Sequence, residues 1–191
     1  MKMNDTERRF GAVTISVHWL TAGLIFTAMA LGWSMDDGSG VAFRWHEWIG
    51  VAVLILVAFR IIWRLFNTMT QPPGDMPSWQ TRAARLTHWG LLAVVGAISI
   101  TGWMAVSATG DPVSLFGWFE LPAIVPQSAA IGGAAEEIHE ALVALLIGLL
   151  GVHVLAALVH HCINDDCTLR RMLGRPRWRV GRVRCLREGS V

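Results

Sequence analysis

Residues 139–161 read HEALVALLIGLLGVHVLAALVHH, an apolar stretch long enough to cross a lipid bilayer that nevertheless contains four histidines. A hydrocarbon core of about 30 Å requires roughly 20 apolar residues in helical conformation. Polar side chains inside such a segment are costly, and they usually mark a cofactor or a conduction pathway. The stretch therefore predicts a membrane-spanning helix with imidazoles near both ends.

Three further segments of the chain have a similar length and apolar character. The four spans are expected at about residues 14–35, 43–66, 88–108 and 138–162. The whole chain is 53% hydrophobic and only 16% charged, which is typical of an integral membrane protein. The alternating pattern of a membrane β-barrel is absent. The predicted fold is all-α, a four-transmembrane-helix up-and-down bundle with antiparallel neighbours.

The connections and their charges predict the topology. The second connection is expected at residues 67–85 and the third at residues 109–137. All but one of the 16 Lys and Arg residues precede the first span, flank the second connection or follow the fourth span, and Arg44 is the exception. Positive residues concentrate on the cytoplasmic side, so both termini are expected to be cytoplasmic.

The chain divides into a membrane domain at residues 1–173 and a basic cytoplasmic tail at residues 174–191. The charge of the tail suits anionic lipid better than nucleic acid, so membrane lipid is an expected partner and nucleic acid is not. Cys162, Cys167 and Cys185 fall on the predicted cytoplasmic side and are expected to be reduced thiols.

Four histidines fall at two depths of the predicted bundle. His139 and His153 are 14 residues apart, which places them within about 40° of one helix face and about 21 Å apart along the axis. His18 lies at the depth of His153, and His46 at the depth of His139. A single intramembrane histidine is equally well explained by an interhelical hydrogen bond. Four histidines at two matched depths favour ligation of a metal centre.

Each depth offers two imidazoles, which suits a haem with two axial ligands better than a zinc or copper site with three or four converging ligands. Small residues would let a macrocycle approach the helices, although close helix packing is an equally good explanation for them. They are Ala22, Gly23, Gly50, Gly90, Gly148 and Gly151. The sequence contains no Cys-x-x-Cys-His motif, so a haem would be bound without covalent attachment.

The motifs around the histidines resemble those of the bacterial cytochrome b561 family. They are SVHWLTAGL at residues 16–24, HEWIG at 46–50, LTHWG at 86–90, EEIHEALV at 136–143 and VHVLAALVHHCINDDCTLRRML at 152–173. The resemblance implies a dihaem cytochrome b of the bacterial inner membrane, similar to the cytochrome b subunits of nickel hydrogenases and formate dehydrogenases. It also implies that His18 and His153 hold a cytoplasmic haem b, and that His46 and His139 hold an outer one.

Two such haems suit electron transfer between the membrane surfaces better than oxygen chemistry. At the inner end, His88, His160 and His161 are candidates for a quinone site that supplies protons, although histidines at a wet helix end are also common. His88 is in addition a reserve candidate for the inner ligand. Arg60 and Arg44 are candidates for binding haem propionates; for Arg60, the positive-inside rule is an equally good explanation.

The resemblance further implies superoxide oxidase activity, in which superoxide donates its electron at the outer face and ubiquinone is reduced. The predicted outer face is acidic, which suits a basic redox protein better than an anion. Its charged residues are Asp36, Asp37, Glu47, Asp111, Glu120, Glu136, Glu137 and Glu140 against Arg44. A second interpretation is a haem-carrying membrane anchor and electron-carrier subunit for a soluble dehydrogenase or cytochrome. A third is a haem-free transporter or structural membrane protein.

Overall fold

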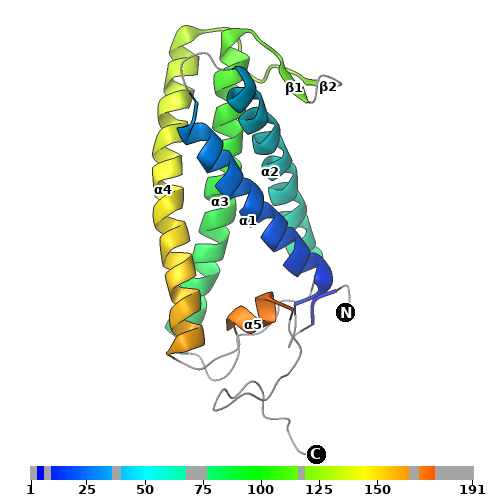
Figure 1. Cartoon of the computed structure of the whole chain (residues 1–191), viewed down its shortest axis with the longest axis vertical. Helices are drawn as coiled ribbons and strands as arrows, with labels where there is room; N and C mark the ends of the chain where they lie inside the picture. The colour runs from blue at the N-terminus through cyan, green and yellow to red at the C-terminus, as the bar shows by residue number, and fades with distance from the viewer. Residues whose placement is uncertain are drawn as a thin grey trace, which may run out of the picture.

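A computed structural model of the chain consists mainly of four long helices packed side by side (Figure 1). The structure describes residues 4–6, 10–35, 40–67, 77–115, 119–163 and 168–174. Several residues discussed above lie outside this part, namely Asp36, Asp37, Cys167, Cys185 and the tail from residue 175.

The long helices are α1 (Ala12–Trp33), α2 (Gly40–Phe66), α3 (Ser78–Thr109) and α4 (Ala129–Cys162), and a short helix α5 (Thr168–Met172) follows them. Each long helix is apolar and long enough to cross a membrane. The predicted up-and-down bundle of four membrane helices is therefore confirmed. A short antiparallel hairpin of β1 (Val113–Leu115) and β2 (Phe119–Leu121) is an additional feature that was not predicted.

Two of the predicted connections are too long. Helix α3 begins at Ser78, inside the connection expected at 67–85, and α4 begins at Ala129, inside the connection expected at 109–137. The side chain of Ser128 caps α4 by accepting a hydrogen bond from the backbone N–H of Ile131. The first turns of α3 are polar, and those of α4 contain small residues followed by Glu136 and Glu137. Neither segment has the continuous run of large apolar residues on which the prediction relied.

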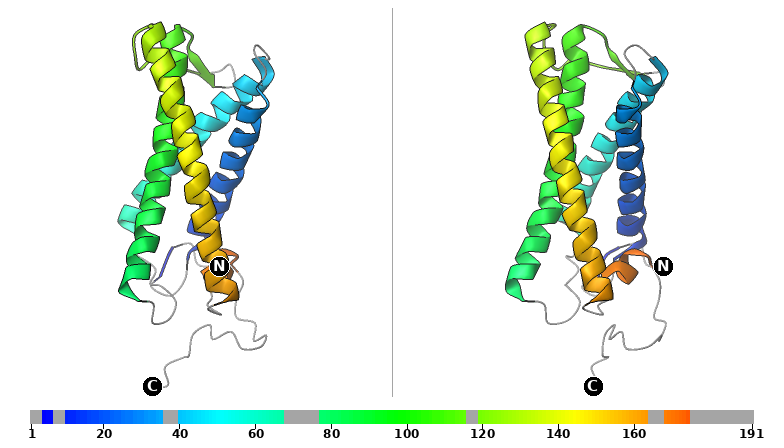
Figure 2. Two further views of the ribbon diagram at one scale, coloured as in Figure 1. Left: turned by 90° about the vertical axis from the view of Figure 1, so that its left-hand side faces the viewer. Right: turned by 60° about the vertical axis from the view of Figure 1, so that its left-hand side comes forward.

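The helices pack in chain order, α1 against α2, α2 against α3 and α3 against α4. Buried apolar side chains fill the region where α2, α3 and α4 meet, and they are Val53, Val57, Leu92, Val95 and Leu146. Within the described residues, no comparable backbone packing joins α1 to α4. Helix α1 runs obliquely across the bundle (Figures 1 and 2). The first and last helices are thus not closed against each other.

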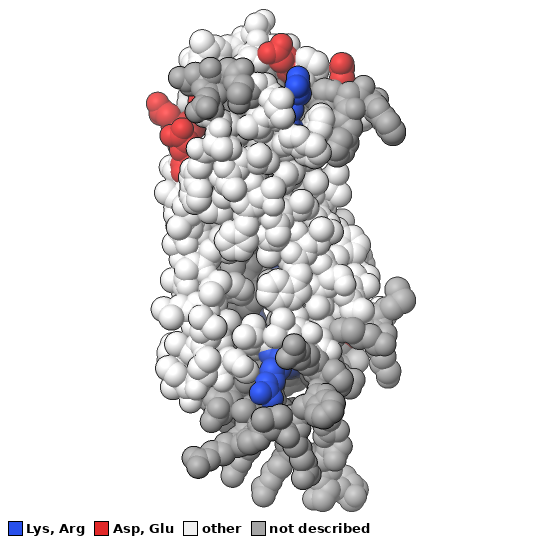
Figure 3. Space-filling model, viewed as in Figure 1, with Lys and Arg blue, Asp and Glu red and all other residues white. Residues whose placement is uncertain are grey.

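The two ends of the bundle differ in charge. Helix α1 begins and α4 ends at one end, and the hairpin lies at the other (Figure 1). Figure 3 shows acidic side chains gathered at the hairpin end, with a basic residue beside them. On the same face, the belt between the ends carries no visible charged side chain, as expected for a surface in contact with lipid.

Candidate functional site

At the hairpin end, His46 of α2 faces His139 of α4. Their ring centroids are 6.1 Å apart, and the ring planes are inclined by 63°. The Nδ1–H of His46 donates to the carbonyl of Ala28, and that of His139 donates to the carbonyl of Ile98, both at 2.9 Å. A carbonyl oxygen only accepts, so the proton must reside on Nδ1. The lone pair of each Nε2 is therefore available to a metal.

Glycines make room for both of these rings. A Cβ added at Gly102 would lie 3.2 Å from Cε1 of His139, and one at Gly32 would lie 3.4 Å from Cε1 of His46. Each glycine is four residues after the carbonyl that accepts the hydrogen bond, so glycine and carbonyl belong to the same helical turn. The sequence prediction missed this support, although the pattern AMALG at 28–32 and ISITG at 98–102 repeats the spacing.

At the opposite end, His18 of α1 faces His153 of α4, with ring centroids 6.3 Å apart. His88 of α3 also contacts His153, with centroids 5.2 Å apart and nearly perpendicular rings. A guanidinium nitrogen of Arg60 lies 3.4 Å from Nδ1 of His18 and donates to it. The edge of the Trp19 ring packs against His18 at a centroid distance of 5.3 Å. This pair thus has a cationic neighbour, and no contact among the described residues gives one to His46 and His139.

Both predicted pairs have the spacing of two imidazoles on opposite sides of a metal ion. Two metal–nitrogen bonds of roughly 2 Å, and about 1 Å from each nitrogen to its ring centre, separate the centroids by roughly 6 Å. The distances of 6.1 Å and 6.3 Å fit this value. The 5.2 Å between His88 and His153 is too short. His18 is therefore the better partner for His153, and His88 remains a neighbour of the pair.

The described residues contain no group of three or more His, Cys, Asp or Glu that could hold a metal ion. A metal at either level would need further ligands from outside the protein. The four nitrogens of a haem supply them, and two opposed imidazoles complete the coordination. The donor set of this chain therefore fits haem better than zinc or copper.

Five of the glycines considered above border open space. A Cβ added at any of five glycines would meet no atom within 4 Å, and these are Gly23, Gly50, Gly90, Gly148 and Gly151. By contrast, a Cβ at Gly96 would lie 3.7 Å from Val57, as expected for close helix packing. Close helix packing therefore does not explain the five glycines.

The remaining candidates lie at different places. Arg44 is exposed at the hairpin end, where its guanidinium lies beside Gly40. None of its contacts in the described part joins it to His46 or His139. His160 and His161 occupy the last turn of α4. The Nδ1 atom of His161 is buried and has no hydrogen-bond partner among the described residues. The structure thus brings Arg60 to the pair of His18 and His153 but does not bring Arg44 to the pair of His46 and His139.

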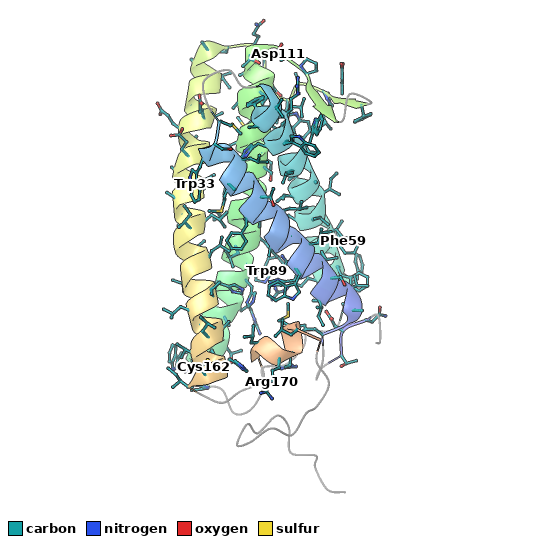
Figure 4. The ribbon with its side chains drawn as sticks, viewed as in Figure 1. Trp33, Phe59, Trp89, Asp111, Cys162 and Arg170 are labelled. Atoms are coloured by element: carbon teal, nitrogen blue, oxygen red, sulfur yellow. The ribbon has the colours of Figure 1, made fainter. Side chains whose placement is uncertain are left out.

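Helix α5 lies at the end of the bundle opposite the hairpin, next to the start of α1 (Figure 4). The indole N–H of Trp19 donates to the backbone carbonyl of Met172 at 2.8 Å. The guanidinium of Arg171 lies over the Phe10 ring at 5.5 Å. These contacts connect α5 to the helix that carries His18.

Comparisons with known proteins identify the family of the chain. Residues 9–175 match the family model described as prokaryotic cytochrome b561. The chain is 35% identical to cytochrome b561 homolog 2 of Escherichia coli (strain K12) over 92% of its own length and 96% of that protein. It is 31% identical to cytochrome b561 homolog 1 of the same organism, over 87% and 98%. It is 28% identical to the probable superoxide oxidase CybB of Yersinia pestis, over 90% and 99%.

Proposed function

Because the chain belongs to the prokaryotic cytochrome b561 family, we propose that it passes electrons across the membrane between the quinone pool and a redox partner at the outer face. The protein is a membrane cytochrome that carries haem b. In this proposal His18 and His153 hold one haem b, and His46 and His139 hold a second, both without covalent attachment. Residues 1–173 form the dihaem domain, and residues 174–191 form a cytoplasmic tail.

The observation that carries the proposal is the pairing of imidazoles at both ends of the bundle, at 6.3 Å and 6.1 Å. His139 and His153 are about 21 Å apart along α4, so the two pairs lie near opposite membrane surfaces. A haem with histidine on both axial sides has no open coordination position and supplies one-electron transfer. The carbonyls of Ala28 and Ile98 hold the outer imidazoles in the tautomer that exposes Nε2.

We orient the protein with both termini in the cytoplasm of a bacterium and the hairpin outside its inner membrane. The distribution of charge supports this orientation, because Arg60, Arg64 and Arg85 lie toward the end where α1 begins, whereas the hairpin end is acidic.

Arg60 is proposed to bind a propionate of the inner haem. If His18 binds the haem through Nε2, its Nδ1 carries the proton. A protonated Nδ1 cannot accept the hydrogen bond that Arg60 now donates to it. The half-buried guanidinium then needs another acceptor, and a propionate carboxylate matches its geometry. Arg44 is proposed for the outer propionate, which would require its side chain to turn away from Gly40.

At the inner end, His88, His160 and His161 are proposed to serve a quinone. Reduction of one ubiquinone to its quinol requires two electrons and two protons, and imidazoles can deliver protons near neutral pH. The buried, unpartnered Nδ1 of His161 is suited to a hydrogen bond with a quinone carbonyl. His88 adjoins His153, so it would act between the inner haem and the quinone.

The outer electron donor is proposed to be either superoxide or a redox protein. Two superoxide anions would release two electrons and leave as dioxygen, which balances the reduction of one ubiquinone. A relative with 28% identity is named a probable superoxide oxidase. The acidic outer end, however, favours a basic redox protein, in which case this chain is an electron-carrier subunit. The described acidic residues there are Glu47, Asp111, Glu120, Glu136, Glu137 and Glu140.

The decisive experiment is a reduced-minus-oxidised spectrum with haem quantitation on the detergent-purified protein. Two b haems per chain are expected, and His18→Ala and His46→Ala should each lose one of them. A wild-type chain with one haem or none would contradict the proposed pairing. Ubiquinone reduction by superoxide with the purified protein alone would then identify an enzyme. Haem reduction only after addition of a soluble partner would identify a carrier subunit.

A further inference from the structure

An apolar groove lies between α2 and α3, away from the histidine pairs. Its volume is about 340 Å³, and all the residues that line it are aliphatic or glycine. They include Leu54, Ala58 and Ile61 of α2, and Leu92, Gly96 and Ile100 of α3. The groove extends over about 10 Å of each helix. Because α2 and α3 are antiparallel, Leu54 and Ile100 mark the end near mid-membrane, and Ile61 and Leu92 mark the inner end.

Arg64 and Trp89 form a cation–aromatic pair that lies one helical turn beyond the inner end of the groove. The Arg64 guanidinium lies 5.0 Å from the centre of the Trp89 ring, which is a cation–π contact. Arg64 follows Ile61 by three residues, and Trp89 precedes Leu92 by three. Residues three apart are neighbours on a helix surface, so this pair continues the two walls of the groove.

Arg85 adds a second positive charge at the same end. It is exposed, it lies one turn before Trp89 on α3, and it is close enough to Arg64 for the two charges to repel each other. Neither arginine contacts a carboxylate within the part of the chain that the structure describes. Two neighbouring guanidinium groups without an acidic partner among the described residues favour binding of an anion from outside the protein.

We propose that this groove binds an acyl chain of an anionic phospholipid whose phosphate contacts Arg64 and Arg85. A phosphate offers acceptors to both guanidinium groups, and basic residues near a membrane surface attract anionic lipids. A lipid leaflet contributes roughly 15 Å of hydrocarbon, so a chain descending from that phosphate would run the length of the groove. Trp89 would lie at the level where tryptophan is enriched, between headgroups and hydrocarbon.

Two other occupants fit less well. A quinone headgroup is uncharged, so it would not account for two arginines that have no carboxylate partner among the described residues at the end of the groove. A second copy of this chain, packed on the same face by a two-fold axis, would bring two more arginines toward the first two. The phospholipid alone matches both the apolar walls and the positive end. Binding of a phospholipid in this groove does not depend on the electron transfer proposed above.

The test is native mass spectrometry of the detergent-purified, haem-loaded protein titrated with phosphatidylglycerol or with phosphatidylcholine of the same acyl chains. Each arginine near an anionic headgroup contributes on the order of fivefold in affinity, so the wild-type chain should bind the first phosphatidylglycerol roughly 25-fold more tightly. The double variant Arg64→Gln, Arg85→Gln should lose this preference. Ala58→Trp, which fills the groove, should weaken binding of both lipids.

Matched controls separate this site from a diffuse basic surface. Arg82→Gln removes a charge from the same end of α3, where Arg82 is already hydrogen-bonded to Ser78, and it should keep the preference. Leu145→Trp enlarges an exposed side chain on α4 and should leave lipid binding unchanged. Equal affinity of the wild-type chain for the two lipids would overturn the proposal. Displacement of the bound lipid by equimolar ubiquinone, or an equal loss of preference in Arg82→Gln, would also overturn it.

Discussion

The imidazole of His139 lies directly against Gly102 of α3, so close that an added Cβ would require the ring to shift by a few tenths of an ångström. A Cβ there would be 3.2 Å from Cε1 and 3.3 Å from Nδ1 of the ring. The same Nδ1 donates to the carbonyl of Ile98, one turn earlier on α3. One helical turn of α3 therefore fixes both the position and the tautomer of a proposed haem ligand on α4.

Gly102→Ala is expected to weaken binding of the outer haem, because the added methyl would push His139 away from the Ile98 carbonyl. Overpacking of this kind costs about 1–3 kcal/mol. Haem quantitation with reduced-minus-oxidised spectra would measure the loss. Gly133→Ala is the control, since a Cβ at that position of α4 meets no atom within 4 Å. Equal haem content in the two variants would contradict this role of Gly102.

The roles of His18 and His88 can be separated by substitution. His18→Ala should lose the inner haem, because only His18 has the 6.3 Å spacing to His153 that fits opposed ligands. His88→Ala should retain that haem, since its ring is 5.2 Å from His153. Spectra of the purified variants would report the number of haems bound. If His88→Ala lost the inner haem and His18→Ala kept it, the reserve assignment of His88 would be correct.

Arg60→Gln should lower the midpoint potential of the inner haem, because a nearby positive charge stabilises the reduced, less positive state. The expected shift is roughly 40 mV, the one-electron equivalent of about 1 kcal/mol. Spectroelectrochemical titration would measure it. Arg44→Gln is the matched control, because Arg44 lies at the outer end and should leave the inner potential unchanged. A shift of the same size in both variants would argue against a local effect of Arg60.

The contact between Trp19 and Met172 should contribute to stability. Trp19→Phe keeps an aromatic ring but removes the indole N–H that donates to the Met172 carbonyl. A hydrogen bond of this type contributes about 1 kcal/mol, so the thermal unfolding midpoint in detergent should fall. Trp79→Phe is the control, because Trp79 is exposed near the start of α3. An equal effect of both substitutions would indicate a general loss of aromatic surface.

The sequence predicted the number of spans, and it predicted which histidines would lie at equal depth. Both properties are local, because hydropathy and the rise of 1.5 Å per residue need no knowledge of neighbouring helices. For His139 and His153, the spacing of 14 residues on one helix was sufficient. The same method placed the starts of α3 and α4 too late, since the first turns of both helices lack a continuous run of large apolar residues.

The partners of the rings depend on how the helices cross. No pattern along one segment indicates that the Ile98 carbonyl receives the Nδ1–H of His139, or that Arg60 rather than Arg44 approaches a histidine. These contacts join residues that are 41 and 42 positions apart. Thus the sequence by itself determined four membrane helices with histidines at two depths, because periodicity and hydropathy act within a helix. Only the tertiary structure decided which atoms surround each imidazole, because that depends on packing between helices.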